Sequence, residues 1–218
     1  MIRAILFDLD GTVLNTLGTI TAAGNDALIR LGYPSLSEEI YLSYVGNGKK
    51  ELIKRMLNAD AENPTLVHQV ESIFDEYYKK NPYQETKPYD GIIELLQTLK
   101  ERNILRIIIT NKDDSAAQMV IRRFFPNCFD LVVGIRAGIH PKPNPSTVQK
   151  VLQHFQLQPE ECIFVGDMEP DVQVAKNANI KSCAVCWGFT KEKILENYQP
   201  DYLIHHPSEL IKVIEENH

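Results

Sequence analysis

The sequence predicts an α/β protein in which a doubly wound, Rossmann-like, mostly parallel sheet carries an inserted helical cap domain. Two observations lead to this prediction. From about residue 88 onward, short apolar runs alternate with helical patterns, as expected for buried parallel strands joined by right-handed crossovers. The stretch between the first apolar run and residue 88 instead shows helical patterns and no convincing strand.

The predicted strands are short, near-continuous apolar runs, the pattern of strands that are covered on both faces of a sheet. The first comprises residues 4–7 (AILF), and the second, 104–110 (ILRIIIT), is rich in β-branched side chains. Four further runs follow at 131–134, 162–166, 182–186 and 201–204.

Helical patterns lie between these runs. In GIIELLQTLKERN, apolar residues at Ile92, Leu95, Leu96 and Leu99 follow the i, i+3, i+4, i+7 spacing of one helix face. The segment STVQKVLQHF repeats this spacing, and 115–125 and 171–178 are shorter candidates. Strand and helix therefore alternate through this part of the chain.

The segment after the first strand is read as an inserted cap. Helices are predicted at 17–31, 37–45, 49–57 and 65–80, and Pro34, the turn 46–48 (GNG) and Pro64 separate them. We therefore expect a core domain formed by residues 1–14 and 83–218 and a helical cap domain formed by residues 15–82.

The composition is that of a soluble globular protein, with 44% hydrophobic and 24% charged residues among 218. A formal net charge of −6 without a basic stripe argues against a nucleic-acid partner. No apolar run approaches the ~20 residues of a membrane span. The first residues do not resemble a signal peptide, so we expect a cytoplasmic enzyme with no membrane partner. Cys183 and Cys186 lie three apart on a predicted strand, so their thiols should diverge as buried structural cysteines.

Acidic residues follow the predicted strands where ligands bind in open α/β sheets. Asp8 and Asp10 end the first strand, and Asp167 follows the strand at 162–166, with Asp171 four residues on. Clustered carboxylates repel one another unless a cation cancels their charge, and magnesium binds such oxygen ligands. Lys142, in the proline-stiffened segment PKPNP, adds a positive charge.

These motifs resemble the haloacid dehalogenase-like (HAD) superfamily. DLDGT at 8–12, TN at 110–111, KPNP at 142–145 and GDxxxD at 166–171 occur in the order that the superfamily shows, and the resemblance covers nearly the whole chain. The helical insertion resembles the α-helical, C1-type cap. The GNG turn, TNK and FVGD are most similar to the phosphoglycolate phosphatase-like members.

The resemblance implies a magnesium-dependent phosphatase that forms an aspartyl-phosphate. Asp8 would attack phosphorus, and Asp10 would protonate the leaving oxygen and then deprotonate water. Mg²⁺ would be bound by the Asp8 carboxylate, the Asp10 carbonyl and the Asp167 carboxylate. Asp171 would approach the metal through water or hold Lys142.

The same resemblance assigns substrate contacts to Thr110 and Lys142, helped by the backbone around Leu9 and Asn111. Lys49 is a candidate for a substrate carboxylate, whereas Lys112 is expected to be solvated. Met168 and Pro170 depart from the Ser and Asn common in close relatives, and Asn15 stands where many have Asp.

The expected partner is a small phosphorylated metabolite, and the chain is expected to be a monomer or homodimer. Phosphoglycolate is the leading substrate candidate. A pyrophosphatase or a nucleotide or sugar phosphatase of the same fold stays open. A β-phosphoglucomutase-like mutase is disfavoured, because residues 17–21 contain no histidine. A catalytically silent HAD-like binding module is disfavoured, because none of the four motif residues Asp8, Asp10, Lys142 and Asp167 is lost.

Overall fold

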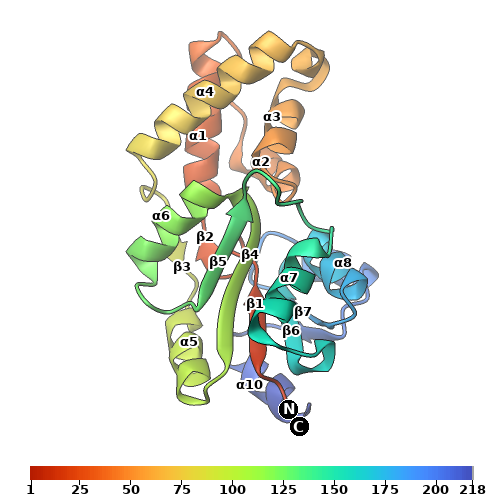
Figure 1. The fold of residues 1–218 in the computed structure, drawn as a ribbon. Helices are drawn as coiled ribbons and strands as arrows, with labels where there is room; N and C mark the ends of the chain where they lie inside the picture. Colours follow the sequence, from red (N-terminus) through yellow and green to blue (C-terminus); the bar gives the residue numbers. More distant parts are fainter. Residues whose placement is uncertain (218) are drawn as a thin grey trace.

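A computed structural model describes residues 1–217 and shows a parallel six-stranded sheet with strand order β5-β4-β1-β6-β7-β8 (Figure 1). All five neighbouring pairs are parallel. The predicted doubly wound sheet is therefore confirmed. Its strands are β1 (Ala4–Phe7), β4 (Leu105–Asp113), β5 (Leu131–Ile135), β6 (Cys162–Gly166), β7 (Lys181–Val185) and β8 (Tyr202–Ile204).

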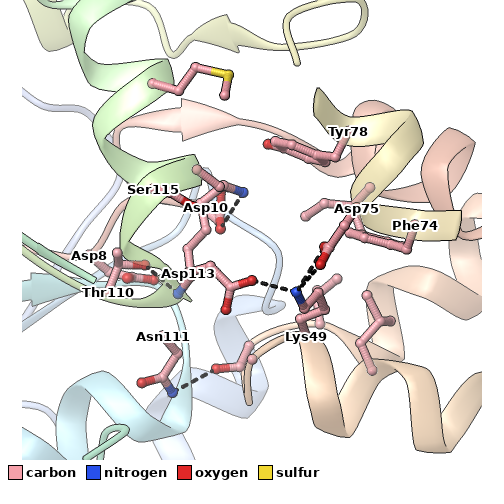
Figure 2. Close-up of a pocket in the computed structure, with 18 of the residues that line it drawn as sticks. Asp8, Asp10, Lys49, Phe74, Asp75, Tyr78, Thr110, Asn111, Asp113 and Ser115 are labelled. Carbon is pink, nitrogen blue, oxygen red and sulfur yellow. Dashed lines mark hydrogen bonds and ion pairs between the residues drawn. The ribbon is translucent and has the colours of Figure 1, made fainter. Parts of the chain in front are cut away.

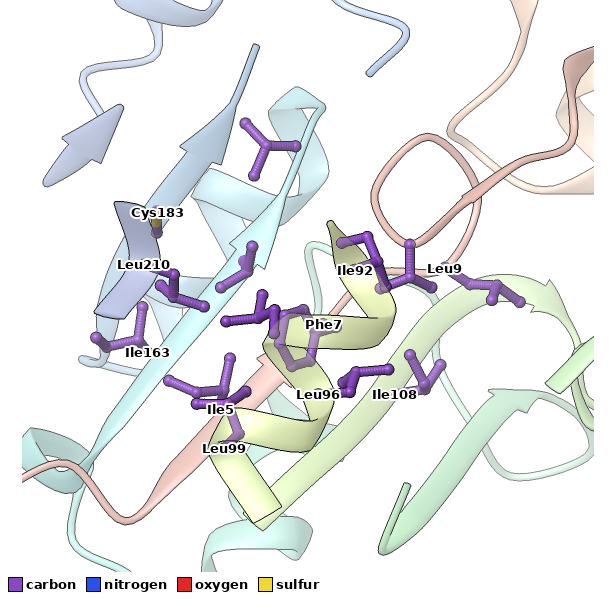
Figure 3. Packing of buried hydrophobic residues seen from close by; sticks show 14 of the residues in the cluster. Ile5, Phe7, Leu9, Ile92, Leu96, Leu99, Ile108, Ile163, Cys183 and Leu210 are labelled. Atoms are coloured by element: carbon purple, nitrogen blue, oxygen red, sulfur yellow. The ribbon is translucent and has the colours of Figure 1, made fainter. Parts of the chain in front are cut away.

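Helices cover both faces of the sheet because alternate strand residues point to opposite sides. Ile5 and Phe7 pack with α5 (Ile92–Glu101), α6 (Asp114–Phe124) and α10 (Glu209–Glu215), as Figure 3 shows for part of this cluster. Ala4 and Leu6 pack on the other face against α7 (Ser146–Phe155) and α8 (Glu169–Asn177). A short helix, α9 (Glu192–Asn197), contributes Leu195 to a smaller cluster with α8 and β7. Burying each large side chain contributes about 1.5–3 kcal/mol, so this packing fixes the strands that bear the acidic residues.

The inserted helices lie at one end of the sheet (Figure 1), and they share a hydrophobic cluster that Phe189, from the segment after β7, also joins. Tyr41, Leu28 and Ile53 are almost completely buried in it. We refer to α1–α4 below as the cap helices. They are α1 (Leu17–Arg30), α2 (Glu38–Tyr44), α3 (Lys49–Leu57) and α4 (Pro64–Lys80), with a 3₁₀ turn at Asn58–Glu62. A second 3₁₀ turn, Pro159–Glu161, precedes β6.

The chain leaves and rejoins the sheet region through a small antiparallel pair that the sequence did not predict. β2 (Leu14–Asn15) pairs with β3 (Lys87–Pro88). Two-residue strands are too short to show a periodic pattern, which is why they were missed. The division of domains at residues 14/15 and 82/83 stays a prediction.

Strand β4 is longer than predicted and continues past Thr110 to Asp113. Its pairing with β5 shifts register between Ile109 and Asp113. A bulge of this kind redirects side chains near the end of a strand. As a result, residues 110–113 present several polar groups toward the cap helices.

The two cysteines of the CxxC segment lie in different clusters, as predicted from strand geometry. Cys183 is buried, but Cys186 is only half-buried, so the prediction that both are buried is wrong for Cys186. Within residues 1–217, no helix combines the length and apolar character needed to cross a bilayer.

Candidate active site

Asp8 follows β1 directly and lies at the carboxyl edge of the sheet. Its backbone N–H donates to the Val165 carbonyl at 2.9 Å, which continues the ladder with β6. The chain then turns sharply, and Gly11 adopts a φ of +89°. A Cβ at position 11 would collide with the Asp167 carboxylate, so glycine is needed both for the turn and for this close approach.

Lys142 joins two of the acidic residues. Its Nζ lies 2.7 Å from Asp8 Oδ1 and 2.6 Å from Asp171 Oδ1. This ion pair is the one polar partner of Asp8 Oδ1 among the described residues. The lysine side chain is only 3% exposed. Asn111 holds its backbone, because Asn111 Oδ1 accepts from the Lys142 N–H at 2.7 Å and Nδ2 donates to the Lys142 carbonyl at 3.2 Å.

Asp167 is held in place by neighbours on both sides. Its Oδ1 accepts from Thr12 Oγ1 at 2.9 Å and its Oδ2 from the Phe189 N–H at 2.8 Å. Asp171 Oδ2 accepts from the Met168 N–H at 3.0 Å, so Asp171 both caps α8 and binds Lys142. The structure thus brings Asp8, Asp167 and Asp171 together, with one oxygen of each within 4.8 Å of the others.

The charges of this cluster are not balanced. Three buried carboxylates face one ammonium group, that of Lys142. Burial, partly offset by Lys142 and reinforced by Asp171 and Asp10, raises the pKa of Asp8 from 3.8 to about 6. Burial and the charges of Asp171 and Asp8 raise the pKa of Asp167 well above its usual value. Burial by itself would lower the pKa of Lys142, but Asp171 and Asp8 outweigh it and raise that pKa.

This donor set fits a hard divalent cation. Oxygen ligands from buried carboxylates, with too little positive charge beside them, are what magnesium and similar ions bind. Burial is the first cause of the two raised carboxyl pKa values, and the neighbouring carboxylates add to it.

The side chain of Asp10 is bonded to a different set of groups. It accepts from Thr16 Oγ1 at 2.7 Å and from Lys112 Nζ at 3.0 and 3.1 Å. The Lys112 ammonium also lies 4.8 Å from the centre of the Tyr78 ring. The prediction that Lys112 is solvated is wrong, since its side chain is only 8% exposed. Burial alone would lower its pKa, but Asp10 and Tyr78 together outweigh burial and raise it.

Lys49 begins α3 and connects the cap helices with the sheet. Its Nζ lies 2.8 Å from Asp75 Oδ1 on α4 and 2.6 Å from Asp113 Oδ2 at the end of β4 (Figure 2). Asn111 Nδ2 makes a second connection by donating to the Gly46 carbonyl at 3.1 Å. The GNG turn and the end of β4 are therefore in direct contact.

A cavity of about 430 Å³ lies between the cap helices and the sheet edge. Asp8 and Asp10 line it, as do Thr110, Asn111 and Lys49 from the predicted set. Lys142, Asp167 and Asp171 are buried beside Asp8 and are not part of the lining. Apolar side chains complete the wall: Ile20, Val45, Leu52, Phe74, Tyr78, Ala116, Met119 and Phe189.

Comparison with known proteins gives the family. Residues 5–185 match the sequence model of the family described as haloacid dehalogenase-like hydrolase.

This chain belongs to the haloacid dehalogenase-like hydrolase family.

Members of this family match this chain along nearly its whole length. A phosphoglycolate phosphatase from Aquifex aeolicus is 30% identical over 217 residues, covering 99% of this chain and 98% of the relative. A crystal structure of a predicted phosphoglycolate phosphatase from Haemophilus somnus superposes with a TM-score of 0.91 at 25% identity and covers 97% of each chain. A haloacid dehalogenase-like family hydrolase from Streptococcus pneumoniae gives a TM-score of 0.86 at 30% identity, with 97% of this chain and 98% of that one covered.

Several contacts of this haloacid dehalogenase-like hydrolase were not predicted from sequence. Thr16 and Lys112 bind Asp10, the Phe189 N–H binds Asp167, and Asp75 and Asp113 bind Lys49. Lys112 had a usable signal, because it follows the strand-end pair TN directly. The other contacts join segments that no motif connects.

Proposed function

We propose that this chain hydrolyses a small phosphate monoester through an aspartyl-phosphate on Asp8, with Mg²⁺ as its cofactor. The chain is a phosphoric monoester hydrolase of the haloacid dehalogenase-like family. One observation supports the aspartyl-phosphate mechanism most directly. The Asp8 carboxylate is buried beside Lys142 and two further carboxylates, yet it lines a cavity that can admit a substrate.

In the proposed first step, an oxygen of Asp8 forms a bond to phosphorus while the bond from phosphorus to the ester oxygen breaks. Asp10 gives its proton to the departing alkoxide, which leaves as the alcohol. The Lys142 ammonium and the Thr110 hydroxyl offset charge on the phosphoryl oxygens, and the Asn111 backbone assists them.

In the second step, water attacks the phosphorus of the aspartyl-phosphate. Asp10, now ionised, takes a proton from that water, and Asp8 is released with inorganic phosphate. Two displacements of this kind divide one difficult reaction into two easier ones. Thr16 and Lys112 orient Asp10 toward the cavity in both steps.

Magnesium would be held by the carboxylates of Asp8 and Asp167 and by the Asp10 carbonyl, with Asp171 holding Lys142 beside them. When bound, it would supply positive charge that reduces repulsion between the anionic ester and the anionic nucleophile. The imbalance of three carboxylates against one ammonium supports this assignment.

Phosphoglycolate is the first compound to test, because a relative that matches over its full length is named phosphoglycolate phosphatase. The free state of all four cysteines is in keeping with the proposed cytoplasmic location, a reducing compartment. A monomer or homodimer stays the prediction for its assembly.

The test is phosphate release from a panel of phosphate monoesters with Mg²⁺ and with EDTA. We expect metal-dependent turnover that Asp8→Asn abolishes, and Asp10→Asn should accumulate a phosphoenzyme visible by intact-protein mass. Turnover retained by Asp8→Asn would refute the covalent mechanism. No turnover of any ester would favour the catalytically silent module.

A further inference from the structure

We infer that the natural ester carries an uncharged, largely apolar alcohol that is larger than glycolate. This inference rests on the proposed phosphatase function and names the substrate class for the same site. It comes from the lining of the cavity, which would enclose the alcohol once the phosphoryl group is next to Asp8.

The wall of the cavity is mostly apolar, and its apolar side chains come from several separate elements. Ile20 lies on α1, Leu52 on α3 and Phe74 on α4, while Met119 comes from α6 and Phe189 from the segment after β7. Apolar groups from both the cap helices and the sheet domain therefore face the space. An apolar alcohol gains by leaving water for such a wall.

An acidic alcohol such as glycolate would need a cation to pair with its carboxylate, and Lys49 is the candidate. The N–H donors of Lys49 are already occupied by carboxylates of the protein. An ammonium group has three N–H donors. Lys49 Nζ contacts Asp75 at 2.8 Å, Asp113 at 2.6 Å and Glu71 at 3.5 Å. Three carboxylates around one ammonium leave no surplus positive charge there for a further carboxylate.

The other lysines of the lining do not replace it. Lys112 contacts both oxygens of Asp10 and faces the Tyr78 ring. Lys79 is exposed to solvent, where water and salt weaken its attraction for an anion. A carboxylate in the apolar part of the cavity would thus lose its hydration without gaining a partner.

The size of the cavity points in the same direction. At about 430 Å³ it falls within the roughly 300–1,000 Å³ of pockets that enclose drug-sized molecules. A two-carbon acid would leave most of the apolar wall in contact with water. A ring-sized alcohol would cover it.

The inference can be tested with three esters whose alcohols are all alkyl and therefore similar in basicity: benzyl phosphate, 4-carboxybenzyl phosphate and phosphoglycolate. We expect kcat/KM with Mg²⁺ to be at least about tenfold higher for benzyl phosphate than for either acid. Equal or higher kcat/KM for phosphoglycolate or the carboxybenzyl ester would overturn the inference and leave the phosphatase proposal intact. No turnover of any of the three would overturn the inference, and no turnover of any ester in the wider panel would overturn both.

A charge-reversal variant tests the same point from the protein side. Met119 is half-buried on α6, so Met119→Lys places an ammonium on the cavity wall, and Met119→Leu is the matched apolar control. The ratio of kcat/KM for carboxybenzyl over benzyl phosphate should rise at least about tenfold in Met119→Lys and stay near wild type in Met119→Leu. A ratio that does not change in a folded Met119→Lys, judged by its melting curve, contradicts the inference.

If Met119→Lys does not fold, Asp75→Asn provides a second test of whether the site excludes acidic alcohols. The Asp75 side chain is 53% exposed, and its neutralisation removes one of the carboxylates that surround Lys49. KM for phosphoglycolate should then fall relative to KM for benzyl phosphate. A selectivity unaffected by this substitution would show that the pairing of Lys49 does not exclude acidic alcohols.

Discussion

Replacing Asp8 by Asn should make the metal-free protein more stable while abolishing turnover. In the folded protein the pKa of Asp8 rises from 3.8 to about 6, first because burial disfavours its charge, an effect that Lys142 only partly offsets. Each pKa unit corresponds to about 1.4 kcal/mol, so ionised Asp8 costs about 3 kcal/mol of folding free energy well above pH 6. Asparagine has nearly the same shape without the charge, and Lys142 keeps Asp171 as its counter-charge at 2.6 Å.

The pH dependence follows from the direction of the shift. A carboxyl group with a raised folded-state pKa costs nothing at a pH where it is protonated in both states, and its cost grows as the pH rises through the folded pKa. The gain from Asp8→Asn should therefore be roughly 1.5 kcal/mol at pH 5 and about 3 kcal/mol at pH 7.5. For a chain of this length, the latter corresponds to about 6–12 °C in Tm.

The assay is thermal and urea unfolding of both proteins in EDTA at pH 5 and 7.5. Asp10→Asn is a control of opposite sign, because it leaves the largely buried ammonium of Lys112 without its carboxylate and should lower stability. A destabilised Asp8→Asn, or a difference from wild type that is the same at both pH values, would contradict this prediction.

Three further outcomes are expected. Lys142→Met should lower the free energy of unfolding by about 3–5 kcal/mol at pH 7.5, because it leaves Asp8 and Asp171 buried without a cation. The loss should be smaller at pH 5, where urea denaturation would show partial recovery as Asp8 becomes protonated. Mg²⁺ should raise the Tm of the wild type more at pH 7.5 than at pH 5, since protonation of Asp8 competes with the ion. Asp167→Asn should abolish the increase in Tm caused by Mg²⁺. Lys112→Met should lower kcat by up to about 100-fold with little change in KM, because Asp10 loses the group that orients it. Lys112→Arg should retain more activity. Equal kcat values for the Met and Arg variants would argue against this positioning role.

Much of the fold was predictable because it depends on local patterns. The predicted helix 49–57 has the bounds of α3, and 65–80 differs from α4 by one residue at its start. Asn63 explains that start, because its side chain accepts from the Thr65 and Leu66 N–H groups behind Pro64. The paired strands β2 and β3 carried no such pattern and were found only in the structure.

The extension of β4 has no counterpart in the local sequence pattern. The apolar run ends at Thr110, and the polar residues after it give no strand signal. They continue the strand because β5 provides a partner, with a shift of register that no local pattern encodes. Asn111, Lys112 and Asp113 owe their contacts in the site to this extension.

By itself, the sequence determined that Asp8, Asp10 and Asp167 would follow buried strands of one parallel sheet, because apolar runs and chain direction place such residues at a common edge. The tertiary structure alone decided which charges meet there. Lys112 and Asp10 are 102 positions apart and meet because β4 and β1 are neighbours in the sheet, whereas Lys49 and Asp113 meet where the cap helices rest on the sheet. The physical reason is that a side chain's charge partner is chosen by three-dimensional packing, whereas its place on a strand or helix is chosen by its neighbours in the chain.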